Sequence, residues 1–300
     1  MSTSLSIGID IGGGSIKSGL YDFTGKEIST TVVETPKDVR TDEFLNCLDK
    51  AIEPFSKSPN LKGIGVGSPG PLDNENGILL ESANLHYLKD VPITNYLSSQ
   101  WKLPIFYEND ANCAALGEAK FGKYHFASSH LVLTLGTGLG GGFVEDGILF
   151  RGYHGNGIEI GHTTAVIDGA LCGCGQRGCQ EAYFSTKGFL NRYLERTSRQ
   201  LRDAEDFFSL VKGSDPDAVQ ILDFGIVTMA ECIRSAIHML NPEAVVLVGG
   251  ITKAWDLFGD KLEAKVRERI FPVLNDRLIF GKGENLAGSL GAASLVFSNA

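Results

Sequence analysis

The chain has 300 residues with a formal net charge of −9; 43% of its residues are hydrophobic and 21% are charged. This length exceeds what one hydrophobic core usually serves, so two domains are expected. The acidic balance, without any run of Lys and Arg, argues against a nucleic-acid partner. No apolar run approaches the roughly 18 residues of a membrane span. Six cysteines without a targeting segment predict a reducing, cytoplasmic location.

A glycine-rich turn follows the first predicted strand. Within residues 6–22 an apolar strand ends at Asp10, the glycines Gly12, Gly13 and Gly14 make a tight turn, and a second strand follows. Glycines at such a turn let backbone N–H groups approach a phosphate closely, and Asp10 is suited to hold a magnesium ion beside it. A hairpin without a ligand can also carry such a turn. Because a strand follows the turn, it is not a dinucleotide-binding fingerprint.

The same pattern recurs in residues 131–147. Thr134 aligns with Asp10, and Gly136 aligns with Gly12, each pair separated by 124 residues. Two copies of strand, glycine turn and strand predict a duplicated architecture that binds a nucleotide between its halves.

The segments between the two copies alternate between helix and strand. A helix is predicted from Thr41, with an apolar face at spacings of three and four residues, and strands are predicted at 61–67 and 105–107. Strands that alternate with helices predict an α/β fold. Asp110 lies where the strand at 105–107 gives way to a helix over 111–121, the position where α/β sheets bind ligands. Aspartate at such a position is also a good helix N-cap, and both interpretations are compatible.

The C-terminal half continues the alternation. A long helix is predicted from Pro216 to Leu240, and a buried strand at 244–248 then leads into Gly249 and Gly250. A closing helix is predicted near the C-terminus.

A cysteine-rich loop lies at residues 158–181. Three cysteines fall within eight residues, with one histidine upstream and glycines between the thiols. Three thiolates and one imidazole form the ligand set of a closed tetrahedral zinc site, which predicts zinc on His162, Cys172, Cys174 and Cys179. Free reduced thiols, a C-x-C redox pair and a disulfide are the weaker alternatives, because none of them uses the glycine spacing and the histidine. Glu159 and Glu181 bracket the loop; their spacing alone is equally consistent with solvated surface acids.

The loop pattern E-x-G-H followed by G-x-x-C-x-C-G-x-x-G-C-x-E resembles the signature of the ROK family of repressors and sugar kinases, as does the segment E-N-D-A-N at 108–112. The resemblance spans Ile7 to Phe297. It implies two ribonuclease-H-like domains of the actin-like ATPase type, with a nucleotide and sugar cleft between them. It also implies that Asp110 is the general base and that zinc is bound by the histidine and three cysteines of the loop.

The resemblance further implies which residues bind the substrates. The sugar-side residues are Ser68, Gly70, Asn84, Asn109, Asp110, Glu159, His162 and Glu181. The nucleotide-side residues are Gly8, Asp10, Gly12, Gly13, Gly14, Ser15, Lys17, Gly136, Thr137, Gly138, Gly140, Gly249 and Gly250. Two departures from the family pattern affect the nucleotide side: Gly14 replaces the usual threonine, with a hydroxyl displaced to Ser15, and Val248 replaces a glycine.

The expected protein is therefore a cytoplasmic, ATP- and Mg²⁺-dependent hexokinase that phosphorylates the 6-hydroxyl of a hexose, with glucose as the first expectation. Its domains are expected at residues 1–120 together with 287–300, and at 121–286. A kinase for an N-acylhexosamine or for fructose is the alternative within enzymes. A sugar-responsive regulator is the alternative from another class, although only ten residues up to Asp10 leave no room for a DNA-binding domain. A non-catalytic sugar-binding protein would not need Asp110. The resemblance admits a homodimer.

Overall fold

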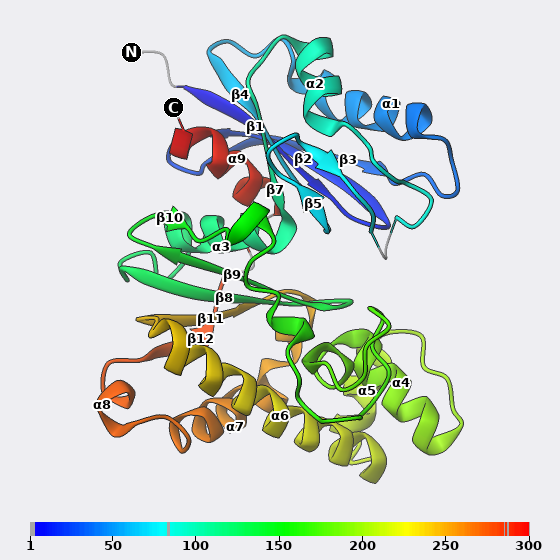
Figure 1. Cartoon of the computed structure of the whole chain (residues 1–300), viewed down its shortest axis with the longest axis vertical. Coiled ribbons are helices and arrows are strands. Elements are labelled where there is room, and N and C mark those ends of the chain that lie inside the picture. Colours follow the sequence, from blue (N-terminus) through cyan, green and yellow to red (C-terminus); the bar gives the residue numbers. More distant parts are fainter. Residues whose placement is uncertain (1–3, 83–84, 285, 287, 300) are drawn as a thin grey trace. The chain divides into compact units, whose positions relative to one another are not determined.

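The computed structural model describes residues 4–82, 85–284, 286 and 288–299. The chain divides into two compact units (Figure 1). Unit 1 comprises Met1–Phe126, Gly142–Ile158 and Leu286–Ala300, and unit 2 comprises Ala127–Gly141 and Glu159–Asn285. The domain boundaries expected from the sequence remain a prediction.

Unit 1 contains a five-stranded sheet with the order β3-β2-β1-β4-β7. The strands β1 and β2 and the strands β2 and β3 pair antiparallel, whereas β1, β4 and β7 run parallel. The strands are β1 (Leu5–Ile11), β2 (Ser15–Asp22), β3 (Glu27–Glu34), β4 (Leu61–Ser68) and β7 (Ile105–Asn109), and the helices of this unit are α1 (Thr41–Ile52), α2 (Ile93–Trp101), α3 (Asp110–Phe121) and α9 (Gly288–Asn299). The short strands β5 (Leu72–Asp73) and β6 (Ile78–Leu79) form a separate hairpin.

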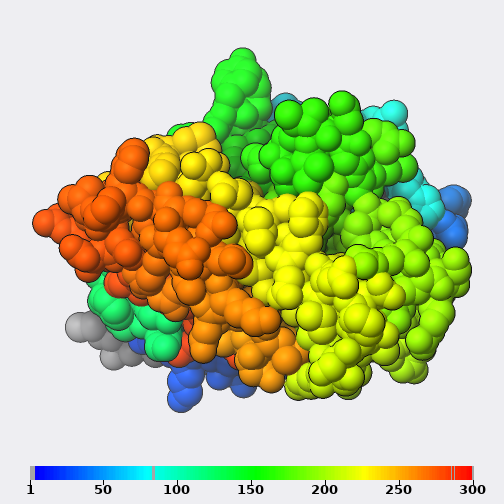
Figure 2. Space-filling model, turned by 90° about the horizontal axis from the view of Figure 1, so that it is seen from below, coloured from blue at the N-terminus to red at the C-terminus, as the bar shows by residue number. Residues whose placement is uncertain are grey.

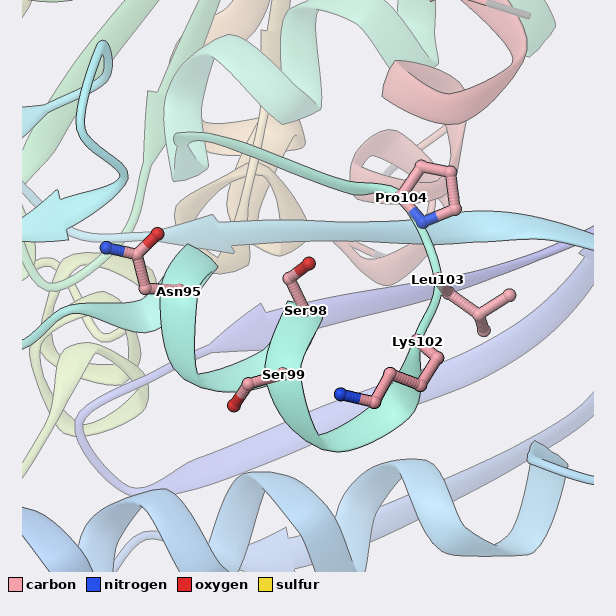
Figure 3. Close-up of a pocket in the computed structure, with 6 residues that line it drawn as sticks. All are labelled: Asn95, Ser98, Ser99, Lys102, Leu103 and Pro104. Carbon is pink, nitrogen blue, oxygen red and sulfur yellow. The ribbon is translucent and has the colours of Figure 1, made fainter.

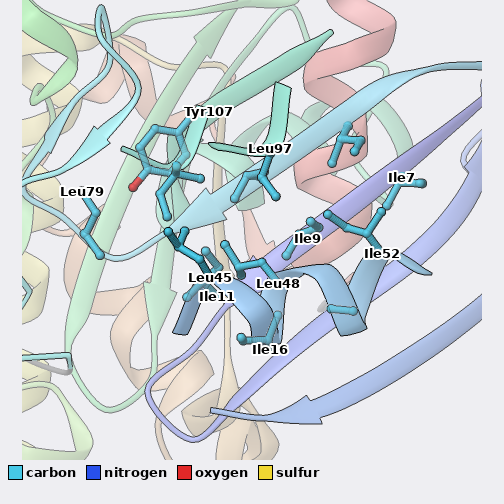
Figure 4. Close-up of a cluster of buried hydrophobic side chains, with 14 of the residues drawn as sticks. Ile7, Ile9, Ile11, Ile16, Leu45, Leu48, Ile52, Leu79, Leu97 and Tyr107 are labelled. Atoms are coloured by element: carbon cyan, nitrogen blue, oxygen red, sulfur yellow. The ribbon is translucent and has the colours of Figure 1, made fainter. Parts of the chain in front are cut away.

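The two faces of β1 are covered in different ways, because successive side chains of a strand point to opposite sides. Ile7, Ile9 and Ile11 are fully buried in a core that includes the apolar face of α1 (Figure 4). On the opposite face, a Cβ atom on Gly8 would lie 1.7 Å from the carbonyl oxygen of Ser289 in α9. Glycine at this position therefore lets the backbone of α9 lie directly on the sheet.

The helix α9 also packs closely against α3. A Cβ atom on Gly291 would lie 2.2 Å from the carbonyl oxygen of Cys113. The predicted closing helix is thus present and belongs to unit 1.

The second sheet has the order β10-β9-β8-β11-β12, and its strands β8, β11 and β12 run parallel. The strands are β8 (Ser129–Leu135), β9 (Leu139–Glu145), β10 (Ile148–Leu149), β11 (Ala244–Val248) and β12 (Ile279–Lys282), and the helices of unit 2 are α4 (Thr186–Thr197), α5 (Ala204–Lys212), α6 (Pro216–Leu240), α7 (Trp255–Arg267) and α8 (Pro272–Asn275). Figure 2 shows α6 in yellow, between the orange α7 and α8 and the yellow-green α4 and α5. An aromatic cluster that includes the buried Phe184, Phe189 and Phe258 fixes α4 and α7 in place.

Most elements agree with the sequence predictions, including both strand–turn–strand copies and the long helix from Pro216. One detail differs at the start of α3. The N-cap is Asn109, whose Oδ1 accepts hydrogen bonds from the backbone N–H groups of Ala111 and Asn112, and Asp110 is the first helical residue. Asp110 is therefore not the cap. None of the helices in the described part of the chain combines the length and the apolar character needed to cross a bilayer.

Candidate functional site

The carboxyl ends of three parallel strands bring the candidate residues of unit 1 together. Register pairs Asp10 with Gly67 and Gly67 with Glu108, and the next row pairs Ser68 with Asn109. Asp110 follows directly at the start of α3. This edge of an α/β sheet is where ligands usually bind, so the sheet itself gathers Asp10, Asn109 and Asp110.

The first glycine turn is braced from the end of β3. The backbone N–H of Gly12 donates to the carbonyl of Ser15 (3.0 Å), while the Thr35 hydroxyl donates to the carbonyl of Gly12 (2.7 Å). A Cβ atom on Gly14 would meet nothing within 4 Å, so this turn offers an open approach to its backbone. Gly13 lies between these two residues. Gly8, by contrast, lies within β1 and faces α9, which assigns it to packing and not to the turn.

Asp10 is partly exposed at the end of β1, opposite Lys17 on β2. Burial raises the pKa of the Asp10 carboxyl, and the positive charge of Lys17 partly opposes this shift. Its carboxylate also lies against the first residue of α9, since a Cβ atom on Gly288 would be 2.5 Å from Asp10 Oδ2. A partly buried carboxylate near an accessible glycine turn is suited to hold a hydrated cation.

The S-P-G-P turn begins at Ser68, the last residue of β4. The Ser68 side chain is fully buried, and its Oγ lies 2.6 Å from the hydroxyl of Tyr107. Its hydroxyl therefore links strands β4 and β7, and the sugar contact expected for Ser68 stays a prediction. Gly70 lies beside Asn109, because a Cβ atom there would be 3.4 Å from Asn109 Nδ2. Asn84 lies outside the described residues.

A buried carboxylate that the sequence did not single out lies immediately before Asn109. The Glu108 side chain has 0% exposure and accepts hydrogen bonds from Asn74 Nδ2 (3.0 Å), Asn112 Nδ2 (3.0 Å), the Asn109 backbone (2.9 Å) and Arg151 Nε (2.7 Å). These donors come from the β5–β6 hairpin, from α3, from β7 itself and from the segment after β10. The residue thus anchors the backbone from which Asp110 projects. In the sequence, only the position of Glu108 in the E-N-D-A-N segment could have indicated that it is important.

The second glycine turn joins β8 to β9 in unit 2. The backbone N–H of Gly136 donates to the carbonyl of Gly138 (3.0 Å), and the backbone N–H of Leu139 donates to Glu181 Oε2 (2.9 Å). Thr137 is the exposed tip of this turn, and Gly140 lies within β9. The turn is therefore tied directly to the cysteine-rich loop.

A third pair of glycines follows β11. Gly249 adopts φ = +103°, and a Cβ atom there would lie 2.4 Å from the Leu135 carbonyl oxygen at the end of β8. Around Gly250 the space is open. Only glycine fits at position 249, because a side chain there would be strained and would collide with Leu135. The chain after β11 can therefore pass close to the end of β8, where the second glycine turn begins.

The cysteine-rich loop brings its four predicted ligands together. The ligand atoms of His162, Cys172, Cys174 and Cys179 all lie within 4.8 Å of one another. The distance from Cys174 Sγ to Cys179 Sγ is 3.7 Å, and Cys172 Sγ lies 3.8 Å from His162 Nδ1. Bonds of ~2.3 Å to a tetrahedral zinc ion place the sulfur atoms ~3.8 Å apart. The donor set and its spacing therefore fit zinc.

The two carboxylates of this loop lie close to the cluster. Burial raises the pKa of the Glu159 carboxyl; His162 lowers this pKa and Glu181 raises it. The backbone N–H of His162 donates to the Glu159 carbonyl (3.0 Å), and Glu181 Oε1 lies 3.6 Å from Cys172 Sγ, so Glu159, His162 and Glu181 form one polar group around the cysteine cluster in unit 2. Such a group, with several acceptors and one imidazole, is suited to bind the hydroxyls of a sugar ring.

A shallow depression elsewhere in unit 1 is lined by Asn95, Ser98, Ser99, Lys102, Leu103 and Pro104 (Figure 3). It surrounds the C-terminal end of α2, and none of the residues expected to bind substrate lines it. The depression is therefore separate from the candidate site.

The chain is similar in sequence to sugar kinases of one family. A model of the ROK family matches residues 6–299. The chain is 33% identical over 306 residues to a glucokinase of Thermotoga maritima, an alignment that covers 97% of this chain and 96% of that protein. It is also 30% identical over 300 residues to an N-acetyl-D-glucosamine kinase of Vibrio cholerae, covering 96% and 98% of the two chains.

The chain is also similar in structure to a kinase of this family. The crystal structure of a ROK family glucokinase from Streptomyces griseus, in complex with glucose and AMPPNP, superposes with a TM-score of 0.83 at 27% identity and covers 98% of this chain and all of that one. The fold of such kinases is that of the two-domain actin-like ATPases, which confirms the predicted fold class.

Proposed function

The chain belongs to the ROK family, and we propose that it is an ATP-dependent hexokinase that phosphorylates the 6-hydroxyl of glucose. The observation that carries the proposal is the row of side chains at one sheet edge, where register aligns Asp10 with Glu108 and α3 begins at Asp110. A carboxylate that binds a cation, near the end of β1, and a carboxylate that accepts a proton, directly after β7, are the parts that phosphoryl transfer to an alcohol requires. The glucokinase relatives support glucose as the acceptor.

Asp110 is the general base in this proposal. A sugar hydroxyl is almost never ionised at neutral pH, so its oxygen attacks phosphorus well only when a nearby group accepts the proton. The carboxylate starts a helix, where its Oδ1 accepts a hydrogen bond from the Ala111 backbone (2.7 Å). Asn109 precedes Asp110 directly and Gly70 lies against Asn109, and both are proposed to contact the sugar.

The two glycine turns bind the phosphates of ATP. In unit 1, Gly12, Gly13, Gly14 and Ser15 offer backbone N–H groups, with Lys17 as the nearby cation. In unit 2 the corresponding groups come from Gly136, Thr137, Gly138 and Gly140, with Gly249 and Gly250 on the adenosine side. Asp10 is suited to hold Mg²⁺, which would neutralise charge on the phosphates. The departures from the family pattern at Gly14, Ser15 and Val248 all lie on this nucleotide side.

Zinc on His162, Cys172, Cys174 and Cys179 is proposed to be structural. Four protein ligands complete a tetrahedral shell and leave no position for water. The ion would hold Glu159 and Glu181 beside His162, where all three bind the sugar. The residue spacing supports this role, since the four ligand atoms already lie within 4.8 Å of one another.

The remaining parts of the proposal concern the molecule's organisation. We place the domains at residues 1–120 with 287–300 and at 121–286, as expected for the family. Dependence on ATP and a loop of reduced thiolates support a cytoplasmic location. A homodimer agrees with the family resemblance, and sedimentation would establish the oligomeric state.

A kinase for N-acetylglucosamine is the second candidate, because that relative is 30% identical to the chain. The competing sugars differ at C1, C2 or C4. A coupled assay of ADP release with glucose, fructose, mannose, N-acetylglucosamine and N-acetylmannosamine separates the candidates. Glucose should give the highest kcat/KM. A higher value for an N-acylhexosamine would transfer the proposal to that substrate, and ADP release with none of the sugars would overturn the kinase assignment.

A further inference from the structure

Glu181 lies between two parts of unit 2 that the proposed function treats separately. Its Oε2 accepts the hydrogen bond from the Leu139 backbone in the second glycine turn (2.9 Å), and its Oε1 lies 3.6 Å from Cys172 Sγ in the cysteine cluster. One carboxylate therefore contacts both the phosphate-binding turn and the metal-binding loop.

The chain that follows Glu181 reinforces this connection. The backbone N–H of Thr186 donates to the Gly136 carbonyl (3.0 Å), and that of Lys187 donates to the Thr137 carbonyl (3.2 Å). These two bonds fix the carbonyl side of the turn. The bond from Leu139 to Glu181 fixes the opposite, N–H side, and it is the one that depends on a side chain.

We infer that Glu181 positions the second glycine turn in addition to binding the sugar, so that sugar binding and nucleotide binding favour each other. The inference rests on the proposed function, because it takes Glu181 as a sugar ligand. A sugar hydroxyl that donates to this carboxylate holds the side chain in one conformation. The Leu139 N–H is then held in the orientation that the turn needs. By thermodynamic linkage, nucleotide binding must strengthen sugar binding by the same factor.

Two glycines of unit 2 offer a matched pair of substitutions. A Cβ atom on Gly138 would lie 2.3 Å from Glu181 Oε2, whereas a Cβ atom on Gly213, which follows α5 and has no proposed role in binding, would lie 3.4 Å from its nearest neighbour, the Ser209 carbonyl oxygen. Neither glycine has a φ in the left-handed region, so alanine is compatible with the backbone at both positions. Gly138→Ala would displace mainly the flexible end of Glu181, and Gly213→Ala would make only ordinary van der Waals contact.

The first experiment measures glucose binding by calorimetry, with and without Mg²⁺–AMPPNP. In the parent, AMPPNP should lower the glucose Kd by about fivefold or more. Gly138→Ala should raise the glucose Kd measured without nucleotide by about fivefold. In this variant the ratio of the glucose Kd without AMPPNP to the glucose Kd with AMPPNP should be close to one. Gly213→Ala should keep both the glucose Kd and the effect of AMPPNP within about twofold of the parent, the usual effect of a surface change away from any binding contact.

The second experiment approaches the same contact from the sugar side. Glu181→Gln replaces a charged acceptor by a neutral one, so the AMPPNP Kd measured without sugar should rise by about fivefold. Glu159→Gln is the control, since among the described residues no hydrogen bond joins the Glu159 side chain to the turn. It should weaken glucose binding and leave the AMPPNP Kd unchanged. Zinc content and thermal unfolding of each variant show whether the loop and the fold remain intact.

The outcomes separate the inference from the proposed function. If the parent binds neither glucose nor another hexose of the panel, the proposed function is wrong and the inference falls with it. If the parent binds glucose and Gly138→Ala, folded and zinc-loaded, binds it equally well, the inference alone is wrong. Should Gly138→Ala not fold, an unchanged AMPPNP Kd for Glu181→Gln would equally overturn the inference.

Discussion

Glu108 is a buried charge whose hydrogen bonds reach into four segments of unit 1. Glu108→Gln keeps the shape but presents an N–H₂ group to donors that need an acceptor, so we expect the free energy of unfolding to fall by ~1–3 kcal/mol. The Asn109–Asp110 backbone should shift as well, which lowers kcat more than it raises the glucose KM. Urea unfolding and steady-state kinetics measure both effects.

The control for Glu108 is Arg151→Met, which removes one half-exposed donor and leaves the carboxylate with its other partners. We expect a smaller loss of stability for this variant. If Glu108→Gln had the same free energy of unfolding as the parent, the hydrogen bonds to Glu108 would not be what holds these four segments of unit 1 together.

Asp10 illustrates a conflict between stability and activity. Burial raises the pKa of its carboxyl above the ordinary value of 3.8. A carboxyl with a raised pKa stabilises the fold below the pKa of the unfolded chain, and this contribution is lost as the pH rises from that value through the folded pKa. At pH 7 the ionised carboxylate therefore destabilises the nucleotide-free protein.

Asp10→Asn should accordingly raise the melting temperature at pH 7 in the absence of Mg²⁺ and ATP. The difference from the parent should shrink as the pH falls toward about 3, where aspartate is largely protonated in both states. Phosphorylation should be strongly reduced because the amide is a poor Mg²⁺ ligand. Thermal unfolding between about pH 3 and pH 7 tests this expectation; a lower melting temperature for the variant at pH 7 would refute it.

The cysteine-rich loop is the element whose structure is expected to depend on the proposed zinc ion. Structural zinc contributes ~10–16 kcal/mol in small zinc-finger peptides, as much as the whole stability of many domains. Cys174→Ser should lose zinc and glucose binding while the far-UV circular dichroism stays close to that of the parent, because the aromatic core of unit 2 lies outside the loop.

Cys47→Ser is the matched control for this loop, since Cys47 lies in α1 and is partly buried. It should keep both zinc and glucose binding. Elemental analysis that finds no zinc in the washed parent protein would end the structural-zinc proposal.

The elements were largely predictable because their signals are local. Alternating apolar residues predicted the strands, and spacings of three and four residues predicted the helices. The close packing of α9 against Gly8 was not predictable, because Gly8 and its neighbour Ser289 lie 281 positions apart in the chain. The same limit applies to Glu108, whose partners Asn74 and Arg151 are separated from it by 34 and 43 residues.

The candidate site was predictable where a motif carries its chemistry. The four predicted metal ligands lie within 4.8 Å of one another, as the spacing of the loop suggested. The contact between the Ser68 and Tyr107 hydroxyls was not predictable, because it joins two neighbouring strands that lie 39 residues apart in the chain. Likewise, the sequence did not show that Asn109 and not Asp110 is the N-cap of α3, because either residue type can cap a helix.

At the scale of the whole molecule, the proposed function assigns residues to both units. Asp10, the proposed Mg²⁺ ligand, and Asp110, the proposed base, belong to unit 1, while the second glycine turn and the proposed sugar ligands Glu159 and Glu181 belong to unit 2. The duplicated strand–turn–strand pattern gives each unit one glycine turn. In this proposal the protein transfers a phosphoryl group to glucose with Asp110 as the base.

The most direct test compares ADP release by the parent and by Asp110→Asn at saturating glucose and Mg²⁺–ATP. Asparagine keeps the size of the side chain and most hydrogen bonds, and the helix cap is retained because Asn109 provides it. The variant should fold with near-parental stability and bind glucose within about threefold of the parent, while turnover falls at least about a hundredfold. A folded Asp110→Asn variant that retains most of the parent's turnover would contradict the account.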